Sequence, residues 1–223
     1  MARFFRAVIM GPPGSGKGTI SSRIVREFSL PYLASGDALR EQISKGTRKG
    51  VTAKEYIEKG QLVPDELVTS LILELLSTYS SQNWLLDGFP RTVQQAEDLS
   101  AKYEISSAIN LDVPDEVIIS RLKGRWLHPV SGRVYNTDFN PPKIPGKDDI
   151  TGDDLIQRDD DKPDVVMARL KNYRKYNFPV LEYYRKRNIL KEFTGRESNE
   201  IWPRVKLYLE EILKKESASV RTF

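Results

Sequence analysis

The sequence contains no cysteine, a single histidine and no apolar run that approaches the length of a membrane span. Without cysteine there are no disulfides, thiolate metal sites or cysteine nucleophiles. The excess of positive over negative charge is also small. The chain has 35 Lys plus Arg and 31 Asp plus Glu, which gives a net charge of +4. No continuous basic stripe with interleaved aromatics is present. We therefore expect neither a nucleic acid nor a membrane as a partner.

The order of apolar segments predicts the fold class. The 223 residues, 39% of them hydrophobic, can form one large domain with a substantial core. Short apolar runs alternate with segments of helical period, which is typical of strand–helix units around a parallel sheet. We expect a three-layer α/β/α fold with five parallel strands, at residues 6–10, 32–34, 84–87, 108–113 and 189–193. The expected helices include residues 17–28, 115–122 and 199–214.

Two insertions interrupt this alternation. Residues 36–79 have helical period throughout and form the first insert. Residues 126–162 lose that period and are rich in Pro and Gly beside short alternating runs. Because a structureless loop of this length is improbable in a compact domain, we expect a small β-rich lid there. The remaining segments 1–35, 80–125 and 163–223 form the core.

The stretch GPPGSGKGT at residues 11–19 follows the first expected strand and opens a helix. In such a turn, backbone N–H groups and the helix N-terminus converge on an anionic phosphate, and Lys17 adds a positive charge. The general phosphate-loop pattern has Ser or Thr after the Lys to meet Mg²⁺, whereas Gly18 stands here and Thr19 follows. A turn that serves only chain geometry is disfavoured by four glycines and a Lys in register. The phosphate-binding residues are predicted to be Gly14, Ser15, Gly16, Lys17, Gly18 and Thr19.

The segment WLLDGFPR places Asp87 at the end of a buried strand. Ligands of doubly wound folds bind at that edge of the sheet. Since Mg²⁺ keeps several of its waters, Asp87 can hold a nucleotide-bound Mg²⁺ through them. Thr19 is then free to bond a phosphate oxygen. A role of Asp87 as the cap of the following turn is the alternative.

Six arginines lie near expected strand ends, helix starts or lid borders. Phosphoryl transfer needs donors on the transferred group, and the planar guanidinium binds pairs of oxygens. Any one of these arginines alone is best interpreted as a solvated surface charge. Their arrangement around a phosphate-binding loop instead favours a clamp, a group that binds phosphate oxygens together. They are Arg40, Arg91, Arg121, Arg125, Arg158 and Arg169.

Together these motifs resemble the long-lid adenylate kinases, one group of nucleoside monophosphate kinases, from the first strand to the last helix. The usual loop of that family is GxPGxGKGT, so Gly18 is the expected residue. The segments SGDALR and DGFPRTVQQAE resemble its AMP-site motifs. The resemblance implies that Arg40 meets the AMP phosphate and that the Gln95 amide reads the adenine edge. The implied AMP site consists of Ser35, Gly36, Arg40, Gly88, Arg91, Gln95, Arg158 and Arg169.

The segments RLKGRW, QRDDD and ARLKNY resemble those that carry the family's other arginines. The resemblance implies that Arg121 lies against the donor base and that Asp160 steadies the closing lid. It also assigns Val134 and Tyr135 to the donor site, beside Arg121 and Arg125. Trp126 stands where bacterial relatives often have a second Arg, which implies a different lid hinge. The implied catalytic residues are Lys17, Arg91, Arg125, Arg158 and Arg169.

Many relatives bind zinc in the lid through four cysteines. The matching positions here are His128, Ser131, Asp148 and Thr151. Because neutral hydroxyls are poor zinc ligands, we expect a hydrogen-bonded tetrad and no zinc. A metal held by His128 and Asp148 alone is the alternative. Mg²⁺, bound with the donor nucleotide, is the expected cofactor.

Within the family, RAVIMG, FNPPK and NEIWP are most similar to the mitochondrial branch that uses GTP. This implies reversible phosphoryl transfer from Mg-GTP, or ITP, to AMP, giving GDP and ADP, by a monomer. The short basic amino terminus is compatible with the mitochondrial matrix, and the cytoplasm is the alternative. An ATP:AMP kinase is the nearest rival. A GTP-binding regulatory protein without phosphotransfer is a second, although the chain lacks the N-K-x-D motif of that class and carries a second nucleotide motif.

Overall fold

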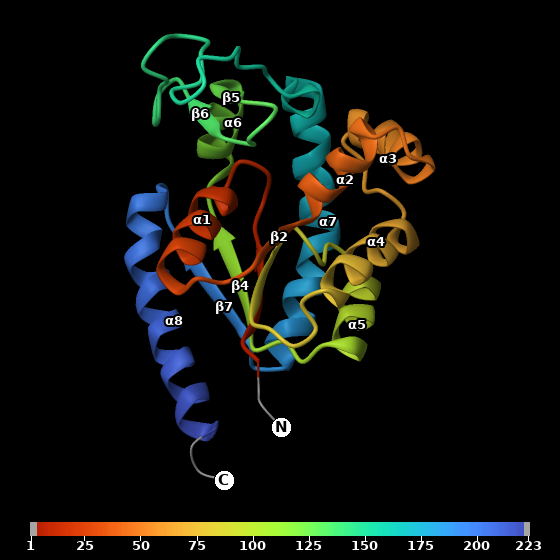
Figure 1. Ribbon diagram of the computed structural model, residues 1–223, viewed down its shortest axis with the longest axis vertical. Helices are drawn as coiled ribbons and strands as arrows, with labels where there is room; N and C mark the ends of the chain where they lie inside the picture. Colours follow the sequence, from red (N-terminus) through yellow and green to blue (C-terminus); the bar gives the residue numbers. More distant parts are fainter. Residues whose placement is uncertain (1–3, 221–223) are drawn as a thin grey trace.

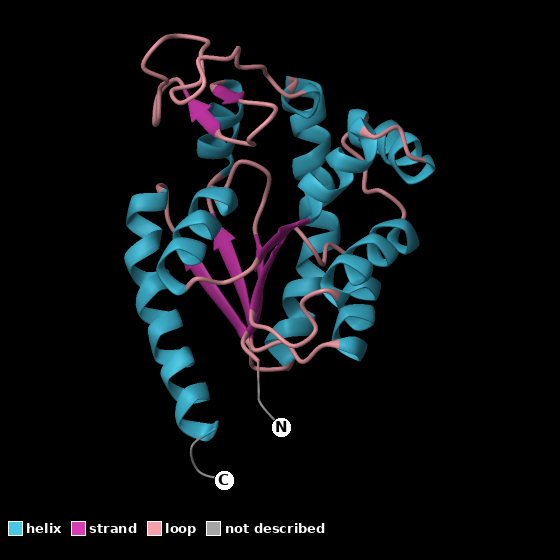
Figure 2. Cartoon of the chain, in the orientation of Figure 1, coloured by secondary structure: helices cyan, strands magenta, loops and turns pink. Residues whose placement is uncertain are grey.

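A five-stranded parallel sheet forms the centre of the molecule (Figures 1 and 2). This computed structural model describes residues 4–220, so residues 1–3 of the basic amino-terminal run and residues 221–223 lie outside the described chain. The strand order is β2-β3-β1-β4-β7, and every pair is parallel. The strands are β1 (Arg6–Met10), β2 (Tyr32–Ala34), β3 (Trp84–Asp87), β4 (Ser107–Asp112) and β7 (Leu190–Thr194). The predicted three-layer α/β/α fold is confirmed.

Helices cover both faces of this sheet (Figure 1). One face packs against α1 (Lys17–Phe28), α6 (Asp115–Lys123) and α8 (Ser198–Val220). The other packs against α2 (Ser35–Ser44), α4 (Asp65–Ser77), α5 (Val93–Lys102) and the second half of α7 (Pro163–Lys186). Because side chains of a strand alternate between faces, Val8 joins one core and Ile9 the other. Burial on both faces explains the continuous apolar runs of these strands.

All five strands end at the same edge of the sheet. The chain leaves β1 towards β2 on one side and returns to β4 on the other, so β1 lies at the point where the strand order reverses. Such a point leaves a crevice outside the carboxyl ends of the strands. The glycine-rich loop and Asp87 both lie at this edge. No helix within residues 4–220 is both long enough and apolar enough to cross a bilayer.

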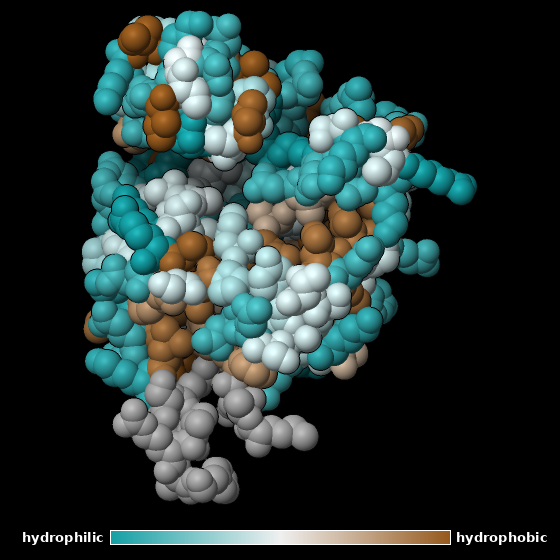
Figure 3. Space-filling view, viewed as in Figure 1, coloured by the Kyte–Doolittle hydropathy of each residue, from teal (hydrophilic) through white to brown (hydrophobic). Residues whose placement is uncertain are grey.

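The two predicted insertions leave the core on either side of this edge (Figure 2). Residues 36–79 contain most of α2, α3 (Arg48–Glu58) and α4. The lid segment contains the antiparallel strands β5 (Arg125–Leu127) and β6 (Val134–Asn136), joined to the following chain by a bridge between Leu127 and Ile156. Figure 3 shows apolar side chains on the outside of the lid, at the top of the view. The exposed apolar residues of this segment include Val130, Val134, Phe139, Ile144, Ile150 and Ile156.

A cluster of buried polar side chains lies inside the lid. The structure brings the four tetrad residues together: Ser131 bonds Nδ1 of His128 at 2.7 Å, and the Thr151 hydroxyl donates to Asp148 at 3.0 Å. Sequence reasoning missed the strongest partner, Arg133, which donates to both oxygens of Asp148 at 2.8 and 2.6 Å. Both His128 and Asp148 are buried.

The Asp148 carboxylate is the hub of this cluster. It also accepts the hydroxyl of Tyr135 at 2.9 Å and the backbone N–H of Thr151 at 2.9 Å. The hydrogen bonds from Arg133 hold the pKa of Asp148 well below its usual range, so the group stays ionised. A neutral side chain here leaves the guanidinium of Arg133 without its paired anion.

We predict that Asp148→Asn loosens the lid without unfolding the core. Amide hydrogen exchange over residues 126–157 should accelerate at neutral pH, while exchange in β1 and β4 stays unchanged. Asp154→Asn is the matched control, because Asp154 is 83% exposed and pairs with Lys147 on the lid surface. Equal exchange rates in the two variants would contradict the role of Asp148 as the hub.

Candidate active site

The glycine-rich loop connects β1 to α1 and turns its backbone towards the sheet edge. Gly16 caps α1 with a φ of 89°, a left-handed conformation. A Cβ at this position would lie 2.6 Å from the Ser198 hydroxyl oxygen at the start of α8, so only glycine fits. The loop is further closed by a 3.1 Å hydrogen bond from the Ser15 N–H to the Pro12 carbonyl. The first N–H groups of α1 therefore point into the crevice, where an anion can accept them.

Lys17 lies over this loop. Its ammonium donates to the carbonyls of Gly11 at 2.8 Å and Pro12 at 2.9 Å. An ammonium has three donors, so one is left for a ligand. Burial lowers the pKa of Lys17 to about 8, although the nearby Asp87 opposes the change. An anion in the crevice would raise that pKa again.

Asp87 ends β3 beside the loop and is buried. Its Oδ2 accepts the Tyr32 hydroxyl at 2.9 Å and the Ser21 hydroxyl at 3.3 Å. Burial raises the pKa of Asp87, while Lys17 and Tyr32 act in the opposite direction. A single carboxylate surrounded by hydroxyls is a hard oxygen donor set, which suits Mg²⁺ held through water and not zinc. Among residues 4–220, no group of three or more His, Asp or Glu side chains could hold a metal directly.

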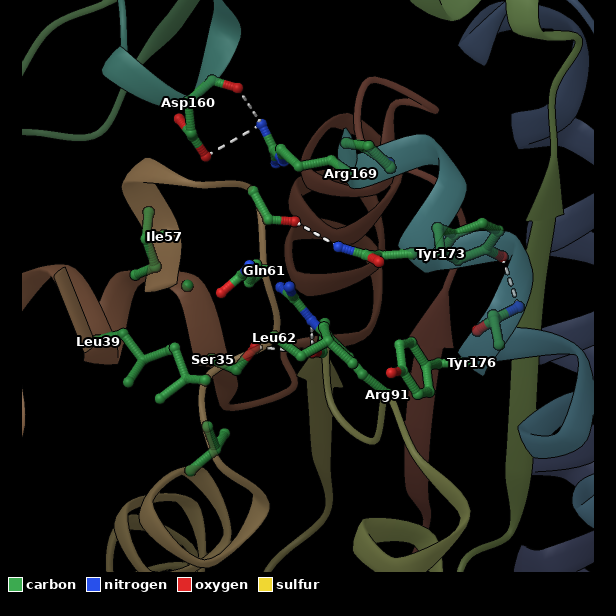
Figure 4. Close-up of a pocket in the computed structure, with 18 of the residues that line it drawn as sticks. Ser35, Leu39, Ile57, Gln61, Leu62, Arg91, Asp160, Arg169, Tyr173 and Tyr176 are labelled. Atoms are coloured by element: carbon green, nitrogen blue, oxygen red, sulfur yellow. Dashed lines mark hydrogen bonds and ion pairs between the residues drawn. The ribbon is translucent and has the colours of Figure 1, made fainter. Parts of the chain in front are cut away.

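A pocket opens from this edge towards the helical insert. Figure 4 shows its apolar wall, formed by Leu39, Ile57 and Leu62 from the insert, and its polar floor, where Ser35 and Arg91 lie. The Ser35 hydroxyl and Arg91 Nε both donate to the Gly88 carbonyl, at 2.8 and 2.7 Å. An apolar wall with a few convergent polar groups is typical of a small-molecule site.

The residues implied for AMP line this one pocket. They are Ser35, Gly36, Arg40, Gly88, Arg91, Gln95, Arg158 and Arg169, and Lys17 and Asp160 line it as well. Arg40 is paired with Asp37, one turn earlier in α2. Gly88 has a φ of 74°, and a Cβ there would lie 2.9 Å from the Ser35 hydroxyl oxygen. The tight approach of these two strand ends therefore requires glycine.

Three arginines at the lid border are held by two neighbouring carboxylates. Arg158 donates to both oxygens of Asp160, at 2.8 and 2.6 Å. Arg125 forms the same fork with Asp161, at 2.6 Å from Nε. Arg169, at the start of α7, bonds the Asp160 carbonyl at 2.8 Å and its carboxylate at 3.0 Å, as Figure 4 shows.

The charges of this cluster are fixed at neutral pH. Burial by itself would raise the pKa of Asp160, but the positive charges of Arg169 and Arg158 lower it to about 2. Burial lowers the pKa of Arg169 to about 10, which still leaves it charged. The cluster thus presents ionised guanidinium groups beside the crevice, each already oriented by an acid.

Three residues implied for the donor site, Arg121, Val134 and Tyr135, are not among those that line this pocket. Arg121 donates to the carbonyls of Gly14 at 3.3 Å and Arg196 at 2.7 Å, and its guanidinium lies 5.4 Å from the ring centroid of Phe139. Val134 is 49% exposed on the lid edge. The side chain of Tyr135, by contrast, points into the lid, so only its backbone is available to a nucleotide.

Sequence reasoning missed several partners of the predicted residues. Asp161 and Asp37 are the carboxylates paired with Arg125 and Arg40. Tyr32 binds Asp87 from the neighbouring strand. The run of three aspartates at residues 159–161 was a signal for Asp161, whereas nothing in the sequence pairs Tyr32 with a residue 55 positions away.

Comparison with known proteins identifies the family of this chain. The profile of the adenylate kinase family, described as "Adenylate kinase", matches residues 9–189. A curated relative, the mitochondrial GTP:AMP phosphotransferase of Drosophila melanogaster, is 49% identical over 207 residues, which cover 93% of this chain and 96% of the relative. The match includes the glycine-rich loop, the pocket and the arginine cluster. The chain belongs to the adenylate kinase family.

Proposed function

We propose that this nucleoside monophosphate kinase transfers the γ-phosphoryl group of Mg-GTP, or of ITP, to AMP, and that it works as a monomer in the mitochondrial matrix. The products are GDP and ADP, and the reaction is reversible. The name of the Drosophila relative supports the choice of donor, acceptor and compartment. An ATP:AMP kinase with the same site is the alternative.

One observation carries the proposal: a phosphate-binding loop and a separate base-sized pocket open onto the same group of cations. The pocket is lined by Lys17 from the loop, Arg91 from the floor and Arg169 from α7. An acceptor phosphate held by Arg40 and Arg91 then faces a donor phosphate held by the loop and Lys17. Placing both substrates in line is the main requirement of phosphoryl transfer.

Side chains of this protein stabilise the negative charge that develops during the transfer. An oxygen of the AMP phosphate attacks the γ-phosphorus while the bond to the oxygen bridging the β- and γ-phosphates breaks. Arg125, Arg158 and Arg169 are oriented before any ligand arrives, so they can follow the charge that spreads over the transferred oxygens. Closure of the lid and the helical insert would exclude water that could otherwise hydrolyse the donor. Mg²⁺, held by Asp87 through water, would neutralise donor phosphate charge.

Donor competition tests the proposal directly. With Mg²⁺ and AMP, we expect rapid ADP formation from GTP or ITP and slow formation from ATP, followed by chromatography. The reverse preference would establish the ATP:AMP alternative with the same mechanism. Tight GTP binding without transfer from either donor would establish the regulatory binding protein.

We expect Arg169→Ala to lower kcat by roughly 10²–10³-fold, because an oriented donor to the transferred group is lost. The Kd of GTP, measured by calorimetry without AMP, should change little. Arg174→Ala is the matched control, since this neighbouring arginine of α7 is 65% exposed and pairs with Asp115 on the surface. A large loss of GTP affinity in Arg169→Ala with an intact kcat would remove the residue from the clamp.

Donor binding should weaken as the pH rises through 8. In the free protein Lys17 loses its charge near pH 8, whereas bound phosphates keep it protonated, so binding above that pH takes up a proton. Between pH 7 and 9 we expect the Kd of Mg-GTP to rise about tenfold, because the pH ends one unit above this pKa. The phosphate's own second ionisation, near pH 6, is complete over this range. The Lys17→Met variant should bind Mg-GTP weakly and show no such rise in Kd between pH 7 and 9. A Kd that does not change with pH in the parent protein would contradict the assignment of this effect to Lys17.

A further inference from the structure

The side-chain amide of Gln95 is held at both ends. Gln95 lies on α5, is 2% exposed and lines the pocket described above. Its Oε1 accepts the backbone N–H of Arg91 at 2.7 Å. Its Nε2 donates to Oδ1 of Asp65 at 2.8 Å, at the first residue of α4. The amide therefore spans two elements that come from the core and from the helical insert.

The chemistry of these partners permits one orientation of the amide. A backbone N–H can only donate, and an ionised carboxylate can only accept. The amide oxygen must therefore face Arg91 and the amide nitrogen must face Asp65. The opposite orientation would set oxygen against oxygen at Asp65 and N–H against N–H at Arg91. Two unpaired contacts in a buried site make that orientation costly.

The carboxylate of Asp65 is itself fixed. The Thr92 hydroxyl, at the N-cap of α5, donates to its Oδ2 at 2.6 Å and accepts the backbone N–H of Gln95 at 3.2 Å. Asp65 does not line the pocket, so it lies behind the amide with respect to a ligand. It can act on a bound base only through Gln95.

An amide held in this way retains one N–H and one oxygen lone pair for a ligand, in a set order. The adenine edge offers the acceptor N1 beside the donor 6-amino group, which this order can match. A 6-oxopurine, such as guanine or hypoxanthine, offers the donor N1–H beside the acceptor O6. Its edge matches only the reversed amide, which Asp65 opposes.

We propose that Asp65 is the positioning residue that makes the acceptor site selective for 6-aminopurine over 6-oxopurine nucleotides, by fixing the orientation of the Gln95 amide. This inference rests on the proposed function, because it requires the AMP base to lie against Gln95. It assigns rejection of the wrong base to a residue that never touches the nucleotide.

The test compares AMP with IMP, which differ only at the 6-position and N1. Asp65→Asn keeps the size of the side chain but can donate as well as accept, so the reversed amide loses one of its two opposing contacts. Calorimetry without donor should show the ratio of Kd values for IMP and AMP falling by about tenfold, the effect of one unpaired buried contact. The ratio of kcat/KM for the two acceptors should fall with it. A purely structural role would weaken both nucleotides alike and leave the ratio unchanged.

Glu66→Gln is the matched control, because Glu66 is exposed in the same first turn of α4 and its change also removes a carboxylate from that helix end. Its ratio should equal that of the parent protein. If Asp65→Asn fails to fold, Asp65→Ser replaces it, with the same expectation. An unchanged ratio in a folded Asp65 variant, with phosphoryl transfer to AMP intact, overturns this proposal alone. A parent protein that neither binds AMP nor transfers to it overturns the proposed function and this inference with it.

Discussion

The fold must hold several positive charges around one crevice when no phosphate is present. Lys17, Arg91, Arg158 and Arg169 all line the same pocket, and burial lowers the pKa of Lys17, Arg91 and Arg169. Backbone carbonyls supply part of the compensation, at Gly11 and Pro12 for Lys17 and at Gly88 for Arg91. The remainder comes from Asp160 and Asp161. Without these acceptors the cations would repel one another and the site would not be organised before binding.

The same acceptors explain how a static arrangement can respond to substrate. The carboxylates of residues 160 and 161 occupy the guanidinium forks that phosphate oxygens also fit. Arg169 stands at the start of α7, whose other end packs Val180 and Tyr184 into the core. Arg169 is therefore carried by a helix anchored in the core, whereas Arg125 and Arg158 lie on the lid side of the same cluster. Figure 1 shows α7 running from the lid border down the length of the core.

The sequence predicted the features that depend on local pattern. Parallel strands buried on both faces appear as apolar runs, and each of the five was predicted to within a residue at either end. The helices α5 and α7 were not predicted. In α7, Pro179 and many charged residues weaken the helical signal, although tertiary packing on both cores supports the helix.

The same distinction between local pattern and long-range contact applies to the candidate site. The glycine-rich loop could be located because its backbone geometry requires glycine at set spacings, and the arginines because they flank elements of regular structure. Contacts between distant segments could not be located, as with Asp65 and Gln95, 30 positions apart, or Tyr32 and Asp87. A residue type alone does not reveal which side of a strand its side chain faces. The sequence therefore did not show that the Tyr135 side chain points into the lid.

Two purine sites in one enzyme pose a problem of mutual exclusion, because each must reject the base that the other binds. In our proposal, the discriminating group at the acceptor pocket is the Gln95 side-chain amide, which is held by Asp65 and the Arg91 N–H. On the donor side, Arg121 already occupies the carbonyls of Gly14 and Arg196, and the Tyr135 hydroxyl is committed to the lid interior. Guanidinium stacking on a base is tolerant of base identity, because every purine has a π-face. Stacking on Arg121 therefore does not explain a preference between GTP and ATP, whereas in our proposal the acceptor pocket rejects 6-oxopurines through an amide whose two ends are held by Asp65 and the Arg91 N–H.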